Sequence, residues 1–223
     1  MGFEYKPNKT VIAKRIAGLF KTGDVVNLGI GLPTMVGNFI PEDVDIMLQS
    51  ENGFLGLGPA PEEGKEDAYL VNAGALPVTL LPGGCYFDSA TSFGIIRGGH
   101  VDYTVLGVLQ ADQNGNLANY KIPGKMVPGM GGAMDLTVGA KIVICAAVHF
   151  DKHGNSKLLK ECTLPLTAEK QVDYLMTDVG FFQIKDGRFV IKEVFEPYTP
   201  EFVLEHTDAD VVKAEDFKIV KIE

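Results

Sequence analysis

The sequence predicts an α/β fold in which a mostly parallel sheet is flanked by helices. Stretches that favour strands alternate along the chain with stretches that favour helices, and this alternation is typical of sheets whose strands are joined by helical connections. The chain has 223 residues, enough for one sizeable core. No linker, internal repeat or low-complexity segment divides it. We therefore expect a single domain spanning residues 1–223.

The first quarter of the chain contains two helix signals between two strand signals. Residues 10–20 place their apolar side chains on one helical face, and Gly23 follows as a stop. Pro33 suits the first turn of a helix, because the N–H that it lacks is not needed there. The expected order is helix 10–20, buried strand 24–31, helix 33–40, strand 45–49 and turn 50–53.

The rest of the chain continues the alternation. Asp88 or Ser89 can cap a helix that ends at Arg97, and Gly131-Gly132 precede a further helix. Residues 185–187 (Lys-Asp-Gly) predict the turn of a hairpin. The remaining expected elements are strands or connectors at 69–74 and 77–84, strands 101–110, 141–150 and 174–177, hairpin 179–195 and helix 199–206.

Composition and charge exclude several classes of protein. Hydrophobic residues make up 46% and charged residues 22%, an ordinary globular mixture. A net charge of −9 without a Lys/Arg run argues against nucleic acid or an anionic membrane as a partner. No apolar run approaches the roughly 18 residues that span a bilayer, and the N-terminus lacks a signal-peptide pattern.

Cysteine and histidine usage points to a reduced, metal-free protein. The three cysteines are odd in number and lack CxxC spacing, so neither disulfides nor a zinc site is expected. The four histidines show no spacing typical of metal ligands. We expect a soluble cytoplasmic protein without a tightly bound cofactor or metal.

Glu51 is the first candidate for chemistry. It follows a predicted buried strand directly and precedes a glycine-rich turn, in the run SENGFLGLG of residues 50–58. Ligands of open α/β sheets bind at the carboxyl ends of the strands. A carboxylate held there can act as a covalent nucleophile toward an acyl group. A surface glutamate that merely begins a loop is the plain alternative.

Several sequence blocks together resemble a known family. NLGIGLPT, SENG, IRGGHVD, GNLANY, IPGKMVPGMGGAMDL and CTLPLT occur in this order between about residues 10 and 178. In order and spacing they are similar to the β subunit of class I coenzyme A transferases of the 3-oxoacid and acetate/acetoacetate type. The resemblance implies the open sheet of these enzymes, which is related to that of sugar-phosphate isomerases.

The resemblance also implies a mechanism and a set of site residues. Glu51 would attack an acyl-CoA thioester, form an acyl-glutamyl anhydride and then carry CoA as a thioester. An incoming short carboxylate, such as acetoacetate, acetate or butyrate, would reverse the sequence. Gly132 would donate its N–H to the developing oxyanion, for which a fixed donor is worth roughly 10²–10³ in rate. The positions that would line the CoA site are Asn27, Asn119, Ala133 and Met134.

Some of these residues have equally simple structural explanations. Asn27 lies within an apolar strand, where an unpaired amide costs about 1–3 kcal/mol, so it bonds either a ligand or the backbone. Asn119 lies in a turn-like segment and suits an Asx turn. Gly29-Ile30-Gly31 lacks the rest of a GxGxxG nucleotide loop. Arg97 and Lys125 could meet CoA phosphates or simply be solvated.

One position departs from part of the family. Some succinyl-CoA- and acetoacetate-using relatives carry a lysine directly after the Ala-Gly that is Ala73-Gly74 here, whereas this chain has Ala75. The difference removes an anion contact and argues against a dicarboxylate co-substrate. The resemblance further implies a separate α subunit that completes the CoA pocket, and a dimer of αβ units.

Three other functions remain open from the sequence. An acyl-CoA hydrolase would use the same glutamate and let water capture the anhydride; Phe54, Leu55 and Leu57 could instead form a dry wall, or be ordinary core. A sugar-phosphate isomerase would need a phosphate loop and an acid/base pair, and neither is evident. A non-catalytic binding role is disfavoured by the intact SENG.

Overall fold

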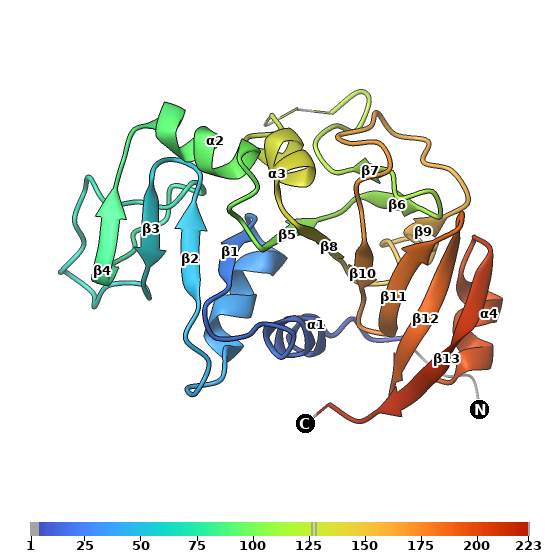
Figure 1. The fold of residues 1–223 in the computed structure, drawn as a ribbon. Helices are drawn as coiled ribbons and strands as arrows, with labels where there is room; N and C mark the ends of the chain where they lie inside the picture. The colour runs from blue at the N-terminus through green and yellow to red at the C-terminus, as the bar shows by residue number, and fades with distance from the viewer. Residues whose placement is uncertain (1–4, 126, 128, 223) are drawn as a thin grey trace.

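The computed structural model describes residues 5–125, 127 and 129–222. Within them a ten-stranded sheet crosses the molecule in the order β13-β12-β11-β10-β8-β5-β1-β2-β3-β4, and a three-stranded sheet, β7-β6-β9, lies beside it (Figure 1). The helices are α1 (Lys9–Ala17), α2 (Ser89–Arg97), α3 (Ala133–Gly139), α4 (Pro200–His206) and the 3₁₀ helix η1 (Leu32–Phe39). The strands are β1 (Val25–Leu28), β2 (Met47–Ser50), β3 (Phe54–Leu57), β4 (Leu80–Tyr86), β5 (Tyr103–Gly107), β6 (Gln110–Asp112), β7 (Leu117–Ala118), β8 (Ile142–Ala146), β9 (Leu158–Leu159), β10 (Tyr174–Met176), β11 (Gly180–Lys185), β12 (Arg188–Phe195) and β13 (Val211–Val220).

The centre of the large sheet is parallel, antiparallel pairs flank it on both sides, and the edge strand β13 is again parallel to β12. Parallel pairs join β2 to β1, β1 to β5, β5 to β8 and β8 to β10. On one side β3 and β4 continue as antiparallel neighbours, and on the other β11 and β12 form a hairpin. The expected mostly parallel α/β sheet is confirmed.

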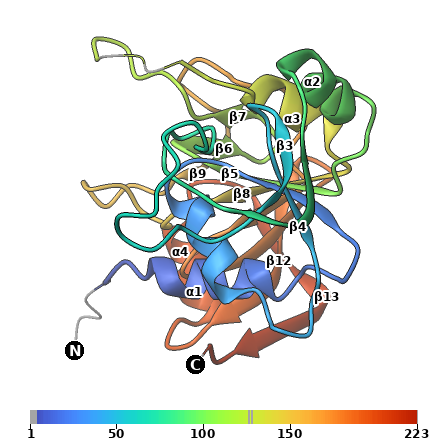
Figure 2. The same ribbon diagram turned by 90° about the vertical axis from the view of Figure 1, so that its left-hand side faces the viewer.

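Helices cover both faces of the sheet. Consecutive residues of its central strands are therefore apolar, instead of every second residue. Along β8, Val143 and Cys145 belong to the cluster that also contains Ile96 of α2 and Leu136 of α3. Ile144 and Ala146 belong to a second cluster, to which α1 contributes its buried side chains. Figure 2 shows α2 and α3 above the sheet and α1 below it.

Several helices and turns have the ends that the sequence predicts. The Asp88 carboxylate accepts a 2.7 Å hydrogen bond from Thr91 N–H at the start of α2, and the helix closes at Gly98. Thr199 caps α4 in the same way. The β11–β12 turn uses Asp186 and Gly187 at φ of 53° and 70°, the left-handed pair that a tight hairpin requires.

Other elements differ from the predictions. The helix expected at 33–40 occurs there, as a 3₁₀ helix. The run 101–110 is not one strand, because β5 ends at Gly107 and Gln110 begins β6 in the smaller sheet. Four strands were not predicted: β3, which the sequence presents as a glycine-rich turn, β13, an edge strand with no fully buried residue, and the short strands β7 and β9 of the smaller sheet. Residues 69–74 form no strand and contribute only a bridge between Val71 and Pro77.

Part of the chain lies outside this description. Met126 and Pro128 of the block 122–136 are not among the described residues. In the part of the chain that the structure describes, no helix combines the length and apolar character that crossing a bilayer requires.

Candidate active site

Glu51 lies at the carboxyl edge of the parallel strands. It follows Ser50, the last residue of β2, and the neighbouring strand β1 runs parallel to β2 with Asn27 opposite Gln49. Parallel strands end at the same edge of a sheet, so the ends of β1 and β2 bring Asn27 and Glu51 together although 24 positions separate them in the chain. The predicted location of Glu51 is therefore the observed one.

The Asn27 side chain joins Glu51 to a buried hydrogen-bond network. Its Nδ2 donates to Gln49 Oε1 at 2.7 Å and to Glu51 Oε2 at 3.1 Å, and also lies 3.3 Å from the Gln49 carbonyl oxygen. Gln49 Nε2 in turn donates to Ser92 Oγ of α2 at 3.0 Å. Asn27, Gln49 and Ser92 are almost fully buried. The network fixes one carboxylate oxygen of Glu51 relative to the sheet and α2.

The sequence did not reveal the whole of this network. We expected Asn27 to bond either a ligand or the backbone, whereas its principal partners are two side chains. Gln49 and Ser92 are site residues that sequence reasoning missed. The available signal was a glutamine at the end of an apolar strand, which one sequence alone does not connect to a serine 43 positions away.

Two buried oxygens mark the same region as polar. Asn27 Oδ1 and Thr104 Oγ1 are the buried side-chain polar atoms without a hydrogen-bond partner in the described residues. Asn27 on β1 pairs directly with Thr104 on β5. An unsatisfied buried polar atom costs about 1–3 kcal/mol. Proteins accept such a cost mainly at functional sites, so its position beside Glu51 supports a functional site here.

The turn after Glu51 depends on a glycine. Gly53 has φ of 129°, and an added Cβ would lie 2.2 Å from the Phe87 carbonyl oxygen. Phe87 N–H donates to the Gly53 carbonyl at 2.9 Å, so this backbone contact ties the turn to the end of β4. A side chain at position 53 would displace the turn and, with it, the adjacent glutamate.

Gly132 lies close to the aliphatic part of the Glu51 side chain. A Cβ added to Gly132 would be 3.2 Å from Glu51 Cγ and 3.5 Å from Phe93 Cζ. The φ of Gly132 is −82°, which any residue adopts, so the close approach of Glu51 is the reason for glycine here. The structure thus brings together three of the predicted site residues, Asn27, Glu51 and Gly132.

The other predicted CoA-lining residues lie on or beyond α3. Ala133 and Met134 form its first turn, Ala133 buried and Met134 partly exposed. Asn119 follows β7, and its Oδ1 accepts a 2.6 Å hydrogen bond from Thr167 Oγ1, so this oxygen bonds a distant side chain rather than closing an Asx turn. No described contact joins Asn119 to Glu51.

Arg97 contacts two neighbours although its side chain is 67% exposed. Its Nε lies 2.7 Å from Asp135 Oδ1, an ion pair that joins α2 to α3. The guanidinium also lies over the Phe93 ring, 5.7 Å from its centroid. Lys125 is exposed.

A cavity of about 700 Å³ opens beside Glu51. It is bounded by the β1–η1 connection, the face of β2 that carries Leu48 and Ser50, and two loops at 57–61 and 72–78. Of the apolar run after Glu51, Leu57 lines this cavity, whereas Phe54 is buried elsewhere with its ring centroid 6.2 Å from that of Tyr86. No sequence signal pointed to the loop residues that complete the cavity.

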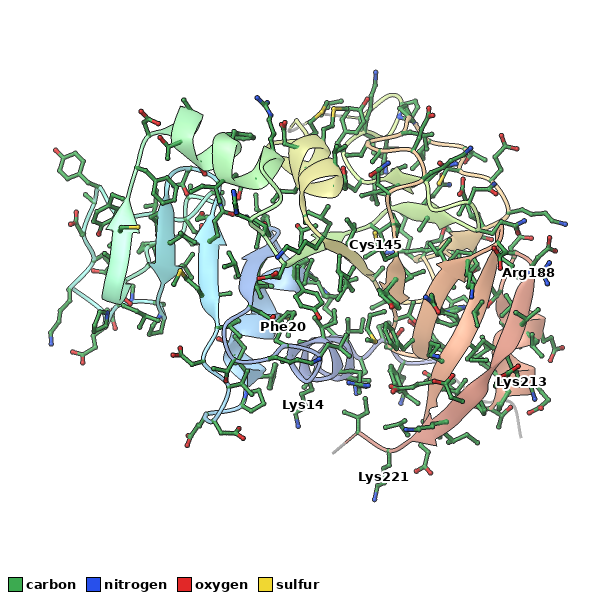
Figure 3. The ribbon with its side chains drawn as sticks, in the orientation of Figure 1. Lys14, Phe20, Cys145, Arg188, Lys213 and Lys221 are labelled. Atoms are coloured by element: carbon green, nitrogen blue, oxygen red, sulfur yellow. The ribbon has the colours of Figure 1, made fainter. Side chains whose placement is uncertain are left out.

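The cysteines lie away from this chemistry. Figure 3 labels Cys145 in the interior on β8, where burial raises the pKa of its thiol far above the ordinary value. All three cysteines are free thiols. Among the described residues, no group of three or more His, Cys, Asp or Glu side chains is arranged to hold a metal ion.

Solved structures support the fold. The chain matches an acyl-CoA transferase apoenzyme from Escherichia coli O157:H7 with a TM-score of 0.74 at 20% identity. This match covers 99% of the chain but 44% of that longer protein.

Curated relatives and a family model give the family. The chain is 54% identical to the β subunit of the acetate CoA-transferase of Haemophilus influenzae, over 96% of each protein. It is 52% identical to one subunit of a probable succinyl-CoA:3-ketoacid coenzyme A transferase of Bacillus subtilis, over 89% of this chain and 92% of that protein. The family model described as coenzyme A transferase matches residues 9–206. With this match and these identities, the chain belongs to the coenzyme A transferase family.

Proposed function

We propose that this chain is the glutamate-bearing subunit of a coenzyme A transferase that moves CoA from an acyl-CoA to a short-chain carboxylate. The observation that carries the proposal is the position of the Glu51 carboxylate. Asn27 donates a hydrogen bond to it, Gly132 lies close to the Glu51 side chain, and a cavity opens beside it. A carboxylate so placed can act as a covalent nucleophile toward an acyl group.

In the proposed chemistry the glutamyl carboxylate first attacks as a nucleophile and its carbonyl carbon is then attacked, so the attacking oxygen leaves with the released acid and the incoming carboxylate replaces it. Glu51 attacks the thioester carbonyl carbon, the carbon–sulfur bond breaks, and CoA leaves as a thiolate. The thiolate then attacks the glutamyl carbonyl of the anhydride, which forms the enzyme–CoA thioester and releases the first acid as a carboxylate. An incoming carboxylate attacks this thioester and the two steps run in reverse. Every bond that forms is matched by one that breaks, so no external oxidant or base is required.

Asn27 would orient the Glu51 carboxylate, and Gly132 would stabilise the negative charge that develops during the reaction. The hydrogen bond from Asn27 leaves the second oxygen of Glu51 for attack and limits rotation of the carboxylate. Gly132 N–H would stabilise the oxyanion that each attack creates, which requires a donor fixed near Glu51. Ala133, Met134 and Asn119 would line the path of CoA, which is a substrate here and not a bound cofactor.

The names of the curated relatives, each one subunit of a transferase, imply a partner chain. We propose that an α subunit completes the CoA pocket and that two αβ units associate. Short monocarboxylates, acetoacetate among them, are the proposed acyl acceptors. The 223-residue chain alone should then show no transfer, and activity should appear when the α subunit is added.

The test is exchange between acetoacetyl-CoA and acetate in the copurified two-subunit complex. Glu51→Ala should lower the rate by several powers of ten, and Glu51→Asp nearly as much, because its carboxylate is withdrawn by about 1 Å. Borohydride after acyl-CoA should reduce a thioester at Glu51 and leave a mass change there. Glu62→Ala, in an exposed loop, is the matched control. Full activity in Glu51→Ala would end the proposal.

A further inference from the structure

The cavity beside Glu51 is lined mainly by apolar residues. Its volume is about 700 Å³, within the range of roughly 300–1,000 Å³ that holds drug-sized ligands. We propose that it binds the uncharged, apolar chain of the acyl group during transfer. This inference rests on the proposed function, because the acyl carbon must bond to Glu51.

The cavity follows the strand that ends at the reactive carboxylate. Along β2 and the residues before it, Ile46, Leu48 and Ser50 line it, and successive residues of one face lie about 6–7 Å apart. The three residues therefore span about 13 Å. An acyl group attached to Glu51 can extend along this face for several carbon atoms.

The walls offer apolar contact. Met35 of η1 and Leu57 of β3 line the cavity, as do Ile30, Leu76 and Leu81. The last three are 69%, 54% and 44% exposed, unusual for side chains of this kind. Burying a methylene of a ligand against such walls is favourable by about 0.8 kcal/mol, a factor of about four.

The charge of the lining disfavours a second anionic group on the chain of the substrate. Among the described lining residues none is Lys, Arg or His, and the charged ones are Asp45, Glu51 and Glu66. A second carboxylate on the substrate would meet only carboxylates. Ala75, where some relatives have lysine, lies between two lining residues and adds no cation.

The same charges argue against the pantetheine arm of CoA as the occupant. With its sulfur at Glu51, the arm would carry the CoA phosphates along β2 toward Asp45, and like charges would repel. Its two amides would also need hydrogen-bond partners, which only a minority of the lining residues, such as Asn38 and Asn72, could offer. The acyl chain has neither requirement.

Gly37 allows the cavity to be shortened. A Cβ added there would lie 3.7 Å from Leu28 Cδ1 and 4.0 Å from Leu48 Cδ1, both lining residues at ordinary contact distance. Gly37→Leu should therefore fill the space between them without a backbone clash. Gly18→Leu is the matched control, since the atoms nearest its Cβ belong to Arg15 and Lys14, outside the cavity.

The experiment measures kcat/KM of the two-subunit complex for acetate, propionate, butyrate, hexanoate and succinate with one acyl-CoA donor. In the native complex, kcat/KM should rise about fourfold for each methylene from acetate to butyrate, and succinate should lie below butyrate. Gly37→Leu should remove most of the gain for hexanoate and keep the acetate rate within about twofold. Leu81→Ala, at a partly exposed rim position, should shift the optimum toward longer acids even if Gly37→Leu folds poorly.

Three results would overturn the inference. A flat chain-length profile with exchange still dependent on Glu51 would remove the acyl pocket and leave the proposed function intact. An equal loss of kcat/KM for acetate and hexanoate in Gly37→Leu would place pantetheine in the cavity instead. Succinate used as well as butyrate would contradict the charge argument.

Discussion

Asn27 and Glu51 share a 3.1 Å hydrogen bond from Nδ2 to Oε2, across the ends of two adjacent parallel strands. The same Nδ2 donates at 2.7 Å to Gln49 Oε1, and Gln49 reaches Ser92 on α2. The orientation of the proposed nucleophile thus depends on the register of β1 against β2 and on the position of α2. A shift of one residue in that register would reverse the side to which Asn27 points.

Replacing Asn27 tests this dependence. Asn27→Ala should reduce kcat of exchange by about 10²-fold, since a misplacement of about 1 Å costs that much in a positioned reaction. Asn27→Asp should be at least as harmful, because it places a like charge beside Glu51 and removes the donor. Single-turnover formation of the enzyme–CoA thioester measures the effect directly.

Asn155→Ala provides the comparison for Asn27, because its amide pairs with Asp151 in an exposed turn. It should leave the rate of thioester formation unchanged. Equal rates in Asn27→Ala and the native complex would show that Glu51 needs no positioning by Asn27.

Gly132→Ala tests the close approach of α3. The added Cβ would lie 3.2 Å from Glu51 Cγ, so either Glu51 or α3 must shift by a few tenths of an ångström. Exchange should fall by about tenfold to a hundredfold, while the melting temperature should change little because the Gly132 backbone is unstrained. Gly94→Ala, with no described atom within 4 Å of its Cβ, should keep the native rate. Loss of activity only through unfolding, seen as a lower melting temperature, would contradict the contact as the cause.

The sequence predicted the elements that local chemistry determines. The Asp88 cap, the turn at Asp186-Gly187 and the apolar run of β8 each depend on neighbouring residues. The cap and the turn occur where expected, and β8 occupies the first part of the strand expected at 141–150. Position at a strand end likewise located Glu51. The resemblance indicated the family, which the comparisons confirm.

What the sequence could not predict depends on contacts between distant segments. β13 is a strand because β12 offers it a parallel partner, although none of its residues is fully buried. β3 contains Gly56 at φ of 85°, where a Cβ would lie 2.8 Å from Gly84 Cα, so its glycine reflects close packing on β4 and not a turn. The bond of Gln49 to Ser92 and the cavity between loops 57–61 and 72–78 arise in the same way.

Variants of Leu57 and Phe54 can distinguish a role in excluding water from a role in core packing. Leu57 lines the cavity beside Glu51, whereas Phe54 is 3% exposed and packs near Tyr86. Leu57→Ala should admit water and raise the fraction of acyl-CoA hydrolysed several-fold relative to transfer. Phe54→Ala should instead lower stability by about 3–5 kcal/mol, the usual cost for a buried phenylalanine.

The measurement is the ratio of free acid to new acyl-CoA at saturating acetate. Hydrolysis that is rapid in the native complex and insensitive to acetate would support a hydrolase that uses the same glutamate. A ratio unchanged in Leu57→Ala would show that other groups keep water from the anhydride.

The burial of His149 should make the free energy of unfolding depend on pH in the acid range. It is fully buried, with Nδ1 3.2 Å from Thr177 Oγ1 and Nε2 3.2 Å from Thr207 Oγ1. Burial lowers its pKa from 6.5 to about 3. As the pH falls below 6.5 the unfolded chain therefore binds a proton that the folded chain does not, and the free energy of unfolding falls by up to about 1.4 kcal/mol per pH unit until the pH nears 3.

Urea unfolding between pH 7.5 and 4.5 can isolate this contribution. The carboxylates with lowered pKa, such as Asp102 and Asp151, lose their stabilising effect only below their ordinary pKa of 3.8. Asp173, whose pKa burial raises, acts in the opposite direction just above that value. Comparison with His149→Gln cancels these other groups. The variant should be less stable at pH 7.5 but lose about 1 kcal/mol less per pH unit between 6 and 4.5. Equal slopes in the two proteins would mean that His149 takes up its proton in the folded state.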